Sequence, residues 1–253
     1  FYQTVLTQAE ITHLATSSGV EGPPPVGLGD EKLWLCPSIN DSANDISGNG
    51  NDGTYQGGMG TVADTGEGGT RAYSFDGSND FIDMTGFSIS QAAYSVSLWM
   101  NLNGPSNQTQ VVFNTADSSS RRSCNIGVGS SGVAIGGHQT TSGNYFVFAT
   151  TVVNNVGWKH VLYTYDGSDL EIFIDGVSEA TVPAVDSNVA QTVAYIGKLG
   201  GGSPSWLYGK LDDIRAYDRA VTQEEITYLA SERGVEGPVP GGGSINALLL
   251  GVG

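Results

Sequence analysis

The stretch Tyr94-Ser-Val-Ser-Leu-Trp-Met-Asn-Leu102 carries an apolar side chain at every second position. Successive side chains of a β-strand point to opposite faces of its sheet, so these alternate residues share one face. They are Tyr94, Val96, Leu98, Met100 and Leu102. The spacing predicts a strand that buries one face in a hydrophobic core.

Shorter β-rich runs separated by glycine turns lie on both sides of this strand. Trp158–Tyr165 and Leu170–Ile174 are joined through Asp-Gly-Ser-Asp, and Ile174-Asp-Gly-Val177 contains a second tight Asp-Gly turn. Many short strands without intervening helices predict an all-β fold, a two-sheet antiparallel sandwich of the jelly-roll type. The other expected strands are Phe81–Met84, Gln110–Phe113, Cys124–Val128, Val133–Gly136, Tyr145–Ala149, Val193–Gly197 and Tyr208–Tyr217.

Two segments have a helical pattern instead. Thr7–Ser17 and Thr222–Arg233 each begin with Thr and Glu three residues apart, continue with Ile and Leu at helical spacing, and are followed by Gly. They belong to a longer repeat, because Leu6–Pro25 matches Val221–Pro240 at 13 of 20 positions with an offset of 215 residues. A repeated unit of this length is a whole domain, which indicates a tandem array.

The repeat suggests three parts of the chain. We expect residues 1–26 to be the C-terminal helix and linker of a preceding repeat, and residues 27–240 to form one complete jelly-roll domain with a short C-terminal helix. Residues 241–253 carry five aliphatic side chains and no charge. Disordered linkers are normally poor in such residues, so this end is expected to be a docking tail or linker that contacts neighbouring copies.

Composition limits the classes of partner. The chain has 26 acidic and 10 basic residues, a formal net charge of −16, and only 14% charged residues with 37 glycines. This charge repels nucleic-acid backbones and anionic lipids, and no apolar run reaches membrane-spanning length. The acidic excess suits calcium, which takes oxygen ligands. Solubility through hydroxyl and amide groups is typical of secreted β-proteins, so the expected location is extracellular, on a cell surface or on a virion surface.

Cys36 and Cys124 leave two alternatives open. One pair has no spacing signature, so a disulfide in an oxidising compartment remains as plausible as two free thiols. In the second case Cys36, within Leu-Trp-Leu-Cys, packs as a small apolar residue.

Several phrases of the sequence resemble the laminin-G-like modules of the concanavalin A-like lectin/glucanase superfamily, in its bacterial and phage branch. The resemblance covers nearly all of Leu33–Leu229 and implies a lectin-like or adhesive unit, although a shared fold does not by itself define a ligand. The phrases that carry it are Asp45-Ile-Ser-Gly-Asn-Gly-Asn-Asp-Gly-Thr54, Tyr73-Ser-Phe-Asp-Gly-Ser-Asn-Asp-Phe-Ile82, Tyr94–Met100, Gly157-Trp-Lys-His-Val161, Leu170-Glu-Ile-Phe-Ile-Asp-Gly176 and Gly209-Lys-Leu-Asp-Asp-Ile-Arg-Ala-Tyr-Asp-Arg-Ala-Val221.

The resemblance also implies that the loop beginning at Asp45 meets the last strand around a structural calcium. Glycines in this loop permit the sharp turns that bring carbonyl and carboxylate oxygens to one point. The expected ligands are Asp45, Asn49, Asp52 and Asp212.

Strand alternation gives a separate reason to consider Asp212. In a regular strand it shares the more apolar face with Ile214 and Ala216, where an ionised carboxylate needs a cation or several donors. The alternative is that Asp212 accepts backbone N–H groups and that the Asn-Gly loop is only a tight turn.

A glycosidase is disfavoured. Hydrolases of this superfamily resemble one another in a Glu-x-Asp-x-Glu strand that places three carboxylates on one face toward the sugar. The nearest phrase here runs from Glu171 to Asp175 and has Phe173 in the central position. Asp175 also precedes glycine in a hairpin turn, where Asp has an ordinary structural role.

Exposed aromatic rings are the candidates for sugar binding, because rings stack on the apolar face of a pyranose. Trp206, Tyr208 and Tyr145 flank loops, whereas Trp34, Trp99 and Trp158 lie within strands and are expected in the core. The sequence therefore predicts a non-catalytic, lectin-like module for adhesion or surface attachment that binds a glycan or surface polysaccharide. The alternative is a structural repeat, such as a fibre segment, spacer or virion decoration, that contacts only protein.

Overall fold

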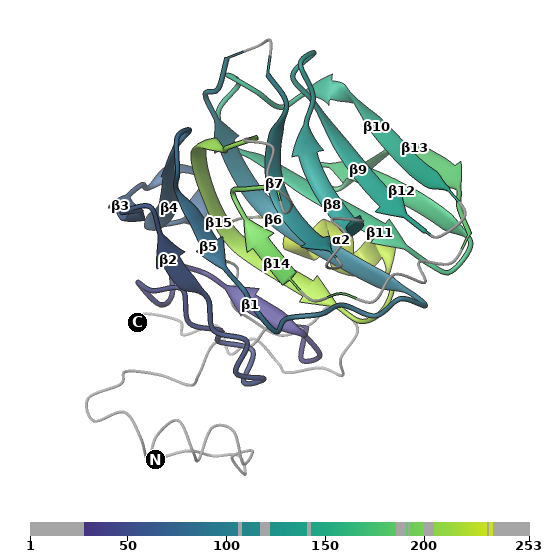
Figure 1. Ribbon diagram of the computed structural model, residues 1–253, viewed down its shortest axis with the longest axis horizontal. Coiled ribbons are helices and arrows are strands. Elements are labelled where there is room, and N and C mark those ends of the chain that lie inside the picture. Colours follow the sequence, from purple (N-terminus) through teal and green to yellow (C-terminus); the bar gives the residue numbers. More distant parts are fainter. Residues whose placement is uncertain are drawn as a thin grey trace, which may run out of the picture.

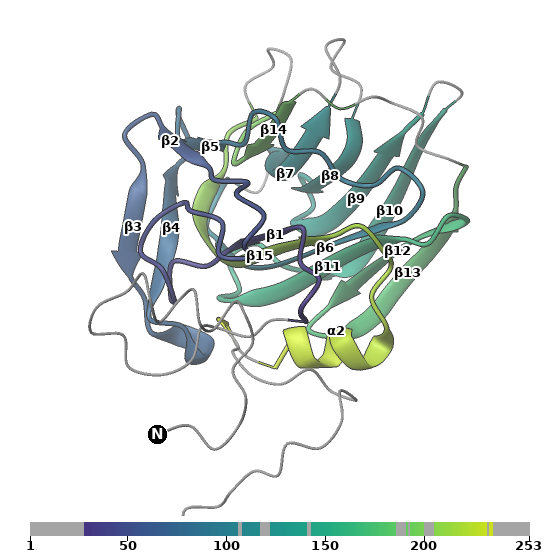
Figure 2. The same cartoon turned by 90° about the horizontal axis from the view of Figure 1, so that it is seen from below.

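The computed structural model describes residues 28–105, 108–116, 122–140, 143–185, 191, 193–199, 205–231 and 233–234. These residues form two antiparallel sheets packed face to face, with the short helix α2, Gln223–Leu229, on the outside (Figures 1 and 2). The predicted all-β sandwich of the jelly-roll type, with a short C-terminal helix, is confirmed. The expected helix in residues 1–26 and the tail 241–253 lie outside the described residues.

One sheet has eight strands in the order β13-β12-β11-β6-β15-β4-β3, with β1 also paired to β15. Its long central strands β6 and β15 pair along most of their length, and β6 contributes more core residues than any other strand of this sheet. The strands are β1 Leu33–Leu35, β3 Gly60–Ala63, β4 Arg71–Asp76, β6 Tyr94–Leu102, β11 Lys159–Tyr165, β12 Asp169–Ile174, β13 Val177–Pro183 and β15 Tyr208–Tyr217.

The other sheet has seven strands in the order β10-β9-β8-β7-β14-β5-β2. A 3-10 turn, Gly66–Gly68, precedes β4 in the first sheet. The strands of the second sheet are β2 Thr54–Gln56, β5 Phe81–Asp83, β7 Gln110–Ala116, β8 Arg122–Val128, β9 Val133–Gln139, β10 Asn144–Val152 and β14 Val193–Ile196.

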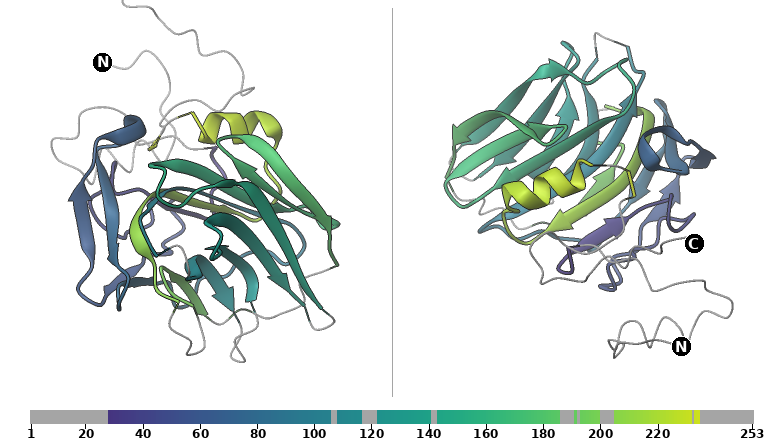
Figure 3. Two further views of the ribbon diagram at one scale, coloured as in Figure 1. Left: turned by 90° about the horizontal axis from the view of Figure 1, so that it is seen from above. Right: turned by 180° about the vertical axis from the view of Figure 1, so that it is seen from behind.

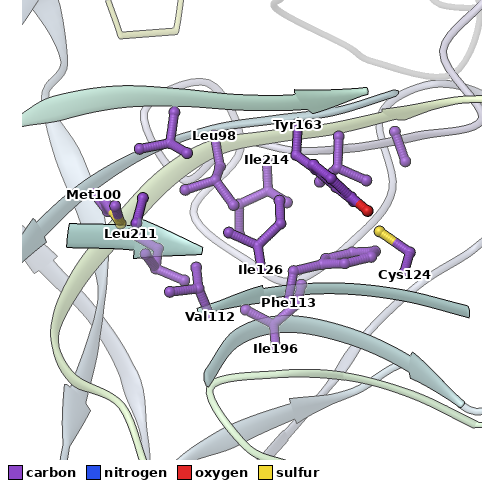
Figure 4. Packing of buried hydrophobic residues seen from close by; sticks show 14 of the residues in the cluster. Leu98, Met100, Val112, Phe113, Cys124, Ile126, Tyr163, Ile196, Leu211 and Ile214 are labelled. Atoms are coloured by element: carbon purple, nitrogen blue, oxygen red, sulfur yellow. The ribbon is translucent and has the colours of Figure 1, made fainter. Parts of the chain in front are cut away.

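The main hydrophobic core fills the space between the sheets. All five alternate residues of β6 are fully buried there, as their spacing predicts. Figure 4 shows Leu98 and Met100 of this strand facing Val112 and Ile126 of the opposite sheet, with Leu211 beside them. Burial of each such side chain contributes about 1.5–3 kcal/mol, so this interface supplies most of the driving force for folding.

A second apolar cluster holds α2 against the outer face of the eight-stranded sheet (Figure 3, right). Ile226 and Leu229 of the helix pack on Leu162, Phe173 and Tyr217. The predicted capping box is present, with Thr222 and Glu225 each accepting from the other's backbone N–H. The helix ends at Leu229, four residues before the predicted end at Arg233. The side chain of Arg233 lies beyond the helix and is buried. No helix in the described part of the chain is long and apolar enough to cross a bilayer.

The alternation expected for β15 is interrupted. Its pairing with β6 shifts register between Asp212 and Arg215, and Asp213 has a left-handed φ of 48°. A bulge inserts one extra residue into a strand, so Leu211 and Ile214, three residues apart, both face the core. The expectation that Asp212 shares a face with Ile214 is therefore wrong, since Asp212 points to the outer side.

Two buried arginines surround this bulge. Arg215 donates to both carboxylate oxygens of Asp213 at 2.8 and 3.0 Å and lies 4.1 Å from the centre of the Trp34 ring. Arg233 lies 3.8 Å from the centre of the Trp158 ring and donates to Asp212 at 3.2 Å. Each charge is thus removed from water but paired, as buried charges require.

Asp212 accepts hydrogen bonds from Ser38 and from the N–H of Asp213 as well as from Arg233. Burial, together with the neighbouring Asp213 carboxylate, raises the pKa of Asp212 to about 6, although Ser38 and Arg233 act in the opposite direction. Because its folded pKa lies above the unfolded value, Asp212 favours folding most at pH below about 4, and this contribution is lost as the pH rises through about 6.

Cys36 and Cys124 are both free and buried. The Cys36 sulfur lies 3.5 Å from Oδ1 of Asp212, whereas Cys124 belongs to the core between the sheets. Burial raises the pKa of both thiols well above the ordinary value. Both cysteines are therefore free thiols, but the apolar packing expected for Cys36 is found for Cys124 instead, since Cys36 donates to the Asp212 carboxylate and belongs to neither apolar cluster.

Glu179 joins the two sheets at one edge of the sandwich. Its carboxylate, on β13, accepts the N–H groups of Thr150 and Thr151 on β10 at 2.6 and 2.8 Å, and also their hydroxyls. Partial burial alone would raise the pKa of Glu179, but these four donors lower it to about 2. This contact fixes the position of β10 relative to the first sheet.

Arg233→Met is expected to lower the free energy of unfolding by about 3–5 kcal/mol at pH 7.5, because it leaves the Asp212 carboxylate buried without its cation. At pH 5 the loss should be smaller, since Asp212 is then largely protonated. Urea denaturation at the two pH values measures both.

Arg219→Met is the matched control. Arg219 pairs with Asp30 and Glu225 but is about one-third exposed, so its removal should cost at most about 1 kcal/mol. Equal losses for the two variants would contradict a special role for the buried pair.

Candidate functional site

The ends of several strands meet around a hollow at one end of the sandwich. Tyr208, the first residue of β15, is paired with Asp76, the last residue of β4. The Tyr208 N–H donates to the side-chain oxygen of Gln110, the first residue of β7, at 2.9 Å. The hollow has a volume of about 290 Å³ and is lined by Asp76, Gly77, Pro105, Gln108, Gln110, Trp206 and Tyr208.

Two of the predicted sugar-binding rings line this hollow together. Trp206 is half-buried and held by the Phe81 ring, whose centroid is 6.1 Å away. Tyr208 is 45% exposed. Gly77, with φ +78°, supports it closely, because a Cβ there would lie 3.1 Å from that of Tyr208. The hollow thus presents two aromatic rings to solvent, and each ring is supported from behind by a neighbouring residue, Phe81 or Gly77.

Gln110 supplies a polar group that sequence reasoning missed. Its side chain lines the hollow but is only 2% exposed, and its Nε2 has no hydrogen-bond partner within the described part of the chain. A Cβ at Gly104 would lie 2.2 Å from this nitrogen, so any larger residue there would displace the amide from its present position. An unpaired buried donor costs about 1–3 kcal/mol, which a ligand oxygen would recover once the amide turned into the hollow, because its nitrogen is closed to solvent as placed.

Asp76 gives the rim of the hollow a negative charge. Its Oδ1 also accepts the N–H groups of Ser78 and Asn79 at 2.8 and 3.3 Å, so the residue organises the turn after β4. Asp80, in the same turn, accepts the N–H of Asp76, and partial burial raises its pKa. The rim therefore disfavours an anionic ligand.

Tyr145, the third predicted sugar-binding ring, lies outside the hollow. It is on β10, three strands away from β7 in the seven-stranded sheet, and its ring is 6.2 Å from that of His138. It packs against the main core and does not line the hollow. Of the three rings predicted for glycan binding, the structure brings Trp206 and Tyr208 together and separates Tyr145.

The predicted calcium ligands are not assembled around one point. Asp45 accepts the backbone N–H groups of Trp34, Ser47 and Asn51 at 2.9–3.0 Å, which occupies both of its oxygens. Asp52 accepts the N–H of Asp45 at 2.8 Å.

The other two predicted ligands have different partners. Asn49 donates to the carbonyl of Glu31, and Asp212 is paired with Arg233. The described residues contain no group of three or more His, Cys, Asp or Glu arranged to hold a metal. As placed, these four side chains do not fit a shared calcium, and calcium binding by the loop stays a prediction.

Asp45→Ala should therefore lower the free energy of unfolding by about 2–4 kcal/mol, because it removes one charged acceptor from three backbone donors. Two explanations of the role of Asp45 are hydrogen bonding alone and calcium binding. Calorimetry of the wild-type chain and of the variant, with excess calcium and with EDTA, distinguishes them by the melting temperatures. Hydrogen bonding alone gives the same melting temperature in both buffers. A wild-type melting temperature that falls in EDTA, with no such fall in the variant, would establish the calcium site instead.

The carboxylates compared with glycosidase catalytic groups have structural partners. Asp175 occupies the turn between β12 and β13, with φ +50°, and pairs with Lys159 and the N–H of His160. The turn role predicted for it is confirmed. Glu171 accepts from the Ser178 hydroxyl across the same hairpin.

Comparisons with known proteins agree with this architecture. The family model described as the concanavalin A-like lectin/glucanases superfamily matches residues 76–227. Comparison with curated protein sequences gives no significant match.

Solved structures show the same fold at low sequence identity. Domain 4 of AbnA, an extracellular arabinanase of Geobacillus stearothermophilus in complex with arabinotriose, superposes with a TM-score of 0.64 at 20% identity, covering 79% of this chain and 98% of that domain. The binding domain of Paraclostridial mosquitocidal protein 1 gives a TM-score of 0.66 at 15% identity, covering 79% of this chain and 52% of that one.

A structure of botulinum neurotoxin type C, whose cell entry depends on two ganglioside molecules, gives a TM-score of 0.64 at 12% identity. The match covers 80% of this chain and 51% of that one, so the present chain spans about half the length of the toxin structures. At these identities the likeness concerns the fold.

Proposed function

This chain belongs to the concanavalin A-like lectin/glucanase superfamily, and we propose that it is a non-catalytic module that binds a neutral glycan in the hollow beside Trp206. The observation that carries the proposal is the convergence of Trp206, Tyr208 and the unpaired Gln110 amide on one hollow. Aromatic faces and a few placed polar groups are the usual elements of a small-ligand site.

Each group has a definite role in this proposal. The Trp206 and Tyr208 rings stack on the C–H face of a sugar ring and exclude water from it. Gln110 donates from Nε2 to a sugar oxygen, while its own oxygen stays bonded to the Tyr208 N–H. The volume of about 290 Å³ suits one or two sugar units.

Charge favours a neutral glycan. Asp76 lies on the rim, and the whole chain has a net charge of −16. Both repel uronic and sialic acids at low ionic strength. The arabinotriose held by the similar arabinanase domain is neutral, whereas gangliosides, on which the similar toxin depends, carry sialic acid, so this choice rests on the charge of the present chain.

The proposed role of the whole module rests on the sequence. The repeat at the two ends of the chain suggests a tandem array, so weak single sites would gain strength through multivalency. We propose that the module acts outside the cell in adhesion or surface attachment, as part of a secreted or surface-displayed protein of the bacterial or phage type. The calcium predicted from the sequence is not needed for glycan contact at this hollow.

A glycan array followed by titration calorimetry on the full chain tests the proposal. We expect neutral oligosaccharides to bind, and Trp206→Ala to weaken their binding at least about tenfold, which corresponds to about 1.4 kcal/mol of lost stacking. Gln110→Ala should weaken binding by a similar factor, because the sugar oxygen loses its donor.

Tyr145→Ala is the matched aromatic control and should leave affinity unchanged, since this ring lies outside the hollow. Thermal melting of each variant checks that the fold is retained. A wild-type chain that binds no glycan on the array, with defined contacts between copies instead, would replace this proposal with the structural-repeat alternative.

A further inference from the structure

The chain enters and leaves the sandwich beside the same strand, β15. Leu28 and Gly234 are the first and last residues that the structure describes, and the chain continues beyond both. The Leu28 N–H donates to Glu31 at 2.5 Å, and the Glu31 carboxylate lies 3.6 Å from the Arg215 guanidinium. The Gly234 N–H donates to Asp213 at 3.2 Å, and Asp213 is paired with Arg215. Three charged side chains therefore connect the entry of the chain to its exit.

Each end has a further anchor. At the entry, the Leu28 side chain joins the apolar cluster that holds α2. At the exit, Arg233 donates to the Asp212 carboxylate at 3.2 Å and to the carbonyls of Asp64 and Gly66 at 2.9 and 2.6 Å. We call the following four residues the end clamp: Glu31, Asp213, Arg215 and Arg233.

The end clamp lies apart from the hydrophobic core and from the hollow beside Trp206. Its side chains are charged and belong to neither apolar cluster, and other residues line the hollow. Tyr208 precedes Arg215 by seven residues of β15, which is about 20 Å along a strand. Tension applied between the two flanking segments therefore passes through the clamp before it reaches the core or the hollow.

Burial makes these contacts difficult to separate. Glu31 is 6% exposed, and the other three clamp side chains are at most 2% exposed. Separating a buried pair leaves a charge without its partner in a site closed to water, which is strongly unfavourable. An exposed pair such as Lys32 with Asp218 exchanges readily with water and resists little. The strongest polar contacts of the described residues at the two ends are thus placed where tension is applied.

We propose that the end clamp is a mechanical device, which carries tension between the flanking segments and keeps the hollow folded while an attached surface is pulled. This inference rests on the proposed role in attachment, because tension on one module of a tandem array passes through both ends of the next. It gives the module a mechanical function that glycan binding by itself does not require.

Force-clamp spectroscopy of the full chain in two pulling directions tests this proposal. In the end-to-end direction, handles are fused at Phe1 and Gly253. In the lateral direction, handles are attached through Val156→Cys and Val185→Cys, which are 48% and 51% exposed, so that the tension crosses β11, β12 and β13. Both native cysteines are buried and remain unlabelled in the folded chain.

Glu31→Gln should unfold at least about tenfold faster than the wild type at the same end-to-end force, because the entry loses its charged link to Arg215. Its unfolding rate in the lateral direction should stay unchanged. Glu179→Gln is the matched control, since Glu179 also accepts two backbone N–H groups but ties β13 to β10. It should speed unfolding in the lateral direction only.

Equal acceleration of Glu31→Gln in both directions would reveal a general loss of stability and overturn the clamp, as would an unchanged end-to-end rate. If Glu31→Gln does not fold, Asp30→Asn takes its place, because it breaks an exposed pair at the entry with Arg219. It should speed end-to-end unfolding by up to about fivefold, and no change would overturn the proposal.

Glycan binding is measured separately, by calorimetry with neutral oligosaccharides. Glu31→Gln should bind them with wild-type affinity, because this residue lies outside the hollow. A wild-type chain that binds none would overturn the proposed function alone, whereas the comparison of the two pulling directions decides the clamp.

Discussion

The bulge at Asp212 and Asp213 in β15, with its two buried arginines, is the constraint on which the arrangement of the chain depends. It joins three distant segments: Trp34 on the first strand stacks on Arg215, and Arg233 beyond the helix reaches Asp212. Removal of either arginine would leave a carboxylate unpaired in a site closed to water. The pairing therefore fixes where β15 lies and where the chain goes after α2.

The candidate site depends on the opposite end of the same strand. β15 begins at Tyr208, and its pairing with β4 places this ring against the turn that follows Asp76. The same residue bonds through its N–H to Gln110 of the other sheet, so the hollow bridges both layers of the sandwich. The same strand, β15, therefore carries both the hollow at its start and the buried charged residues further along. The charged residues and the aromatic rings are nevertheless separate groups.

Much of the fold could be predicted from the sequence, because alternation in β6 and the Asp-Gly turn at Asp175 are local patterns. The bulge could not, since Leu-Asp-Asp-Ile-Arg reads equally well as an uninterrupted strand. Trp206 and Tyr208 were identified as exposed rings near loops. Gln110 was missed because only the pairing between distant strands brings its amide to them.

The most direct test of glycan binding at the hollow is nuclear magnetic resonance of the full chain during titration with the neutral oligosaccharide that binds best. The account predicts that the indole N–H of Trp206 and the side-chain amide of Gln110 shift in a saturable way, with the amides around Gly77. Saturable shifts confined to other surfaces, such as the loop at Asp45, with Trp206 and Gln110 unmoved, would contradict it.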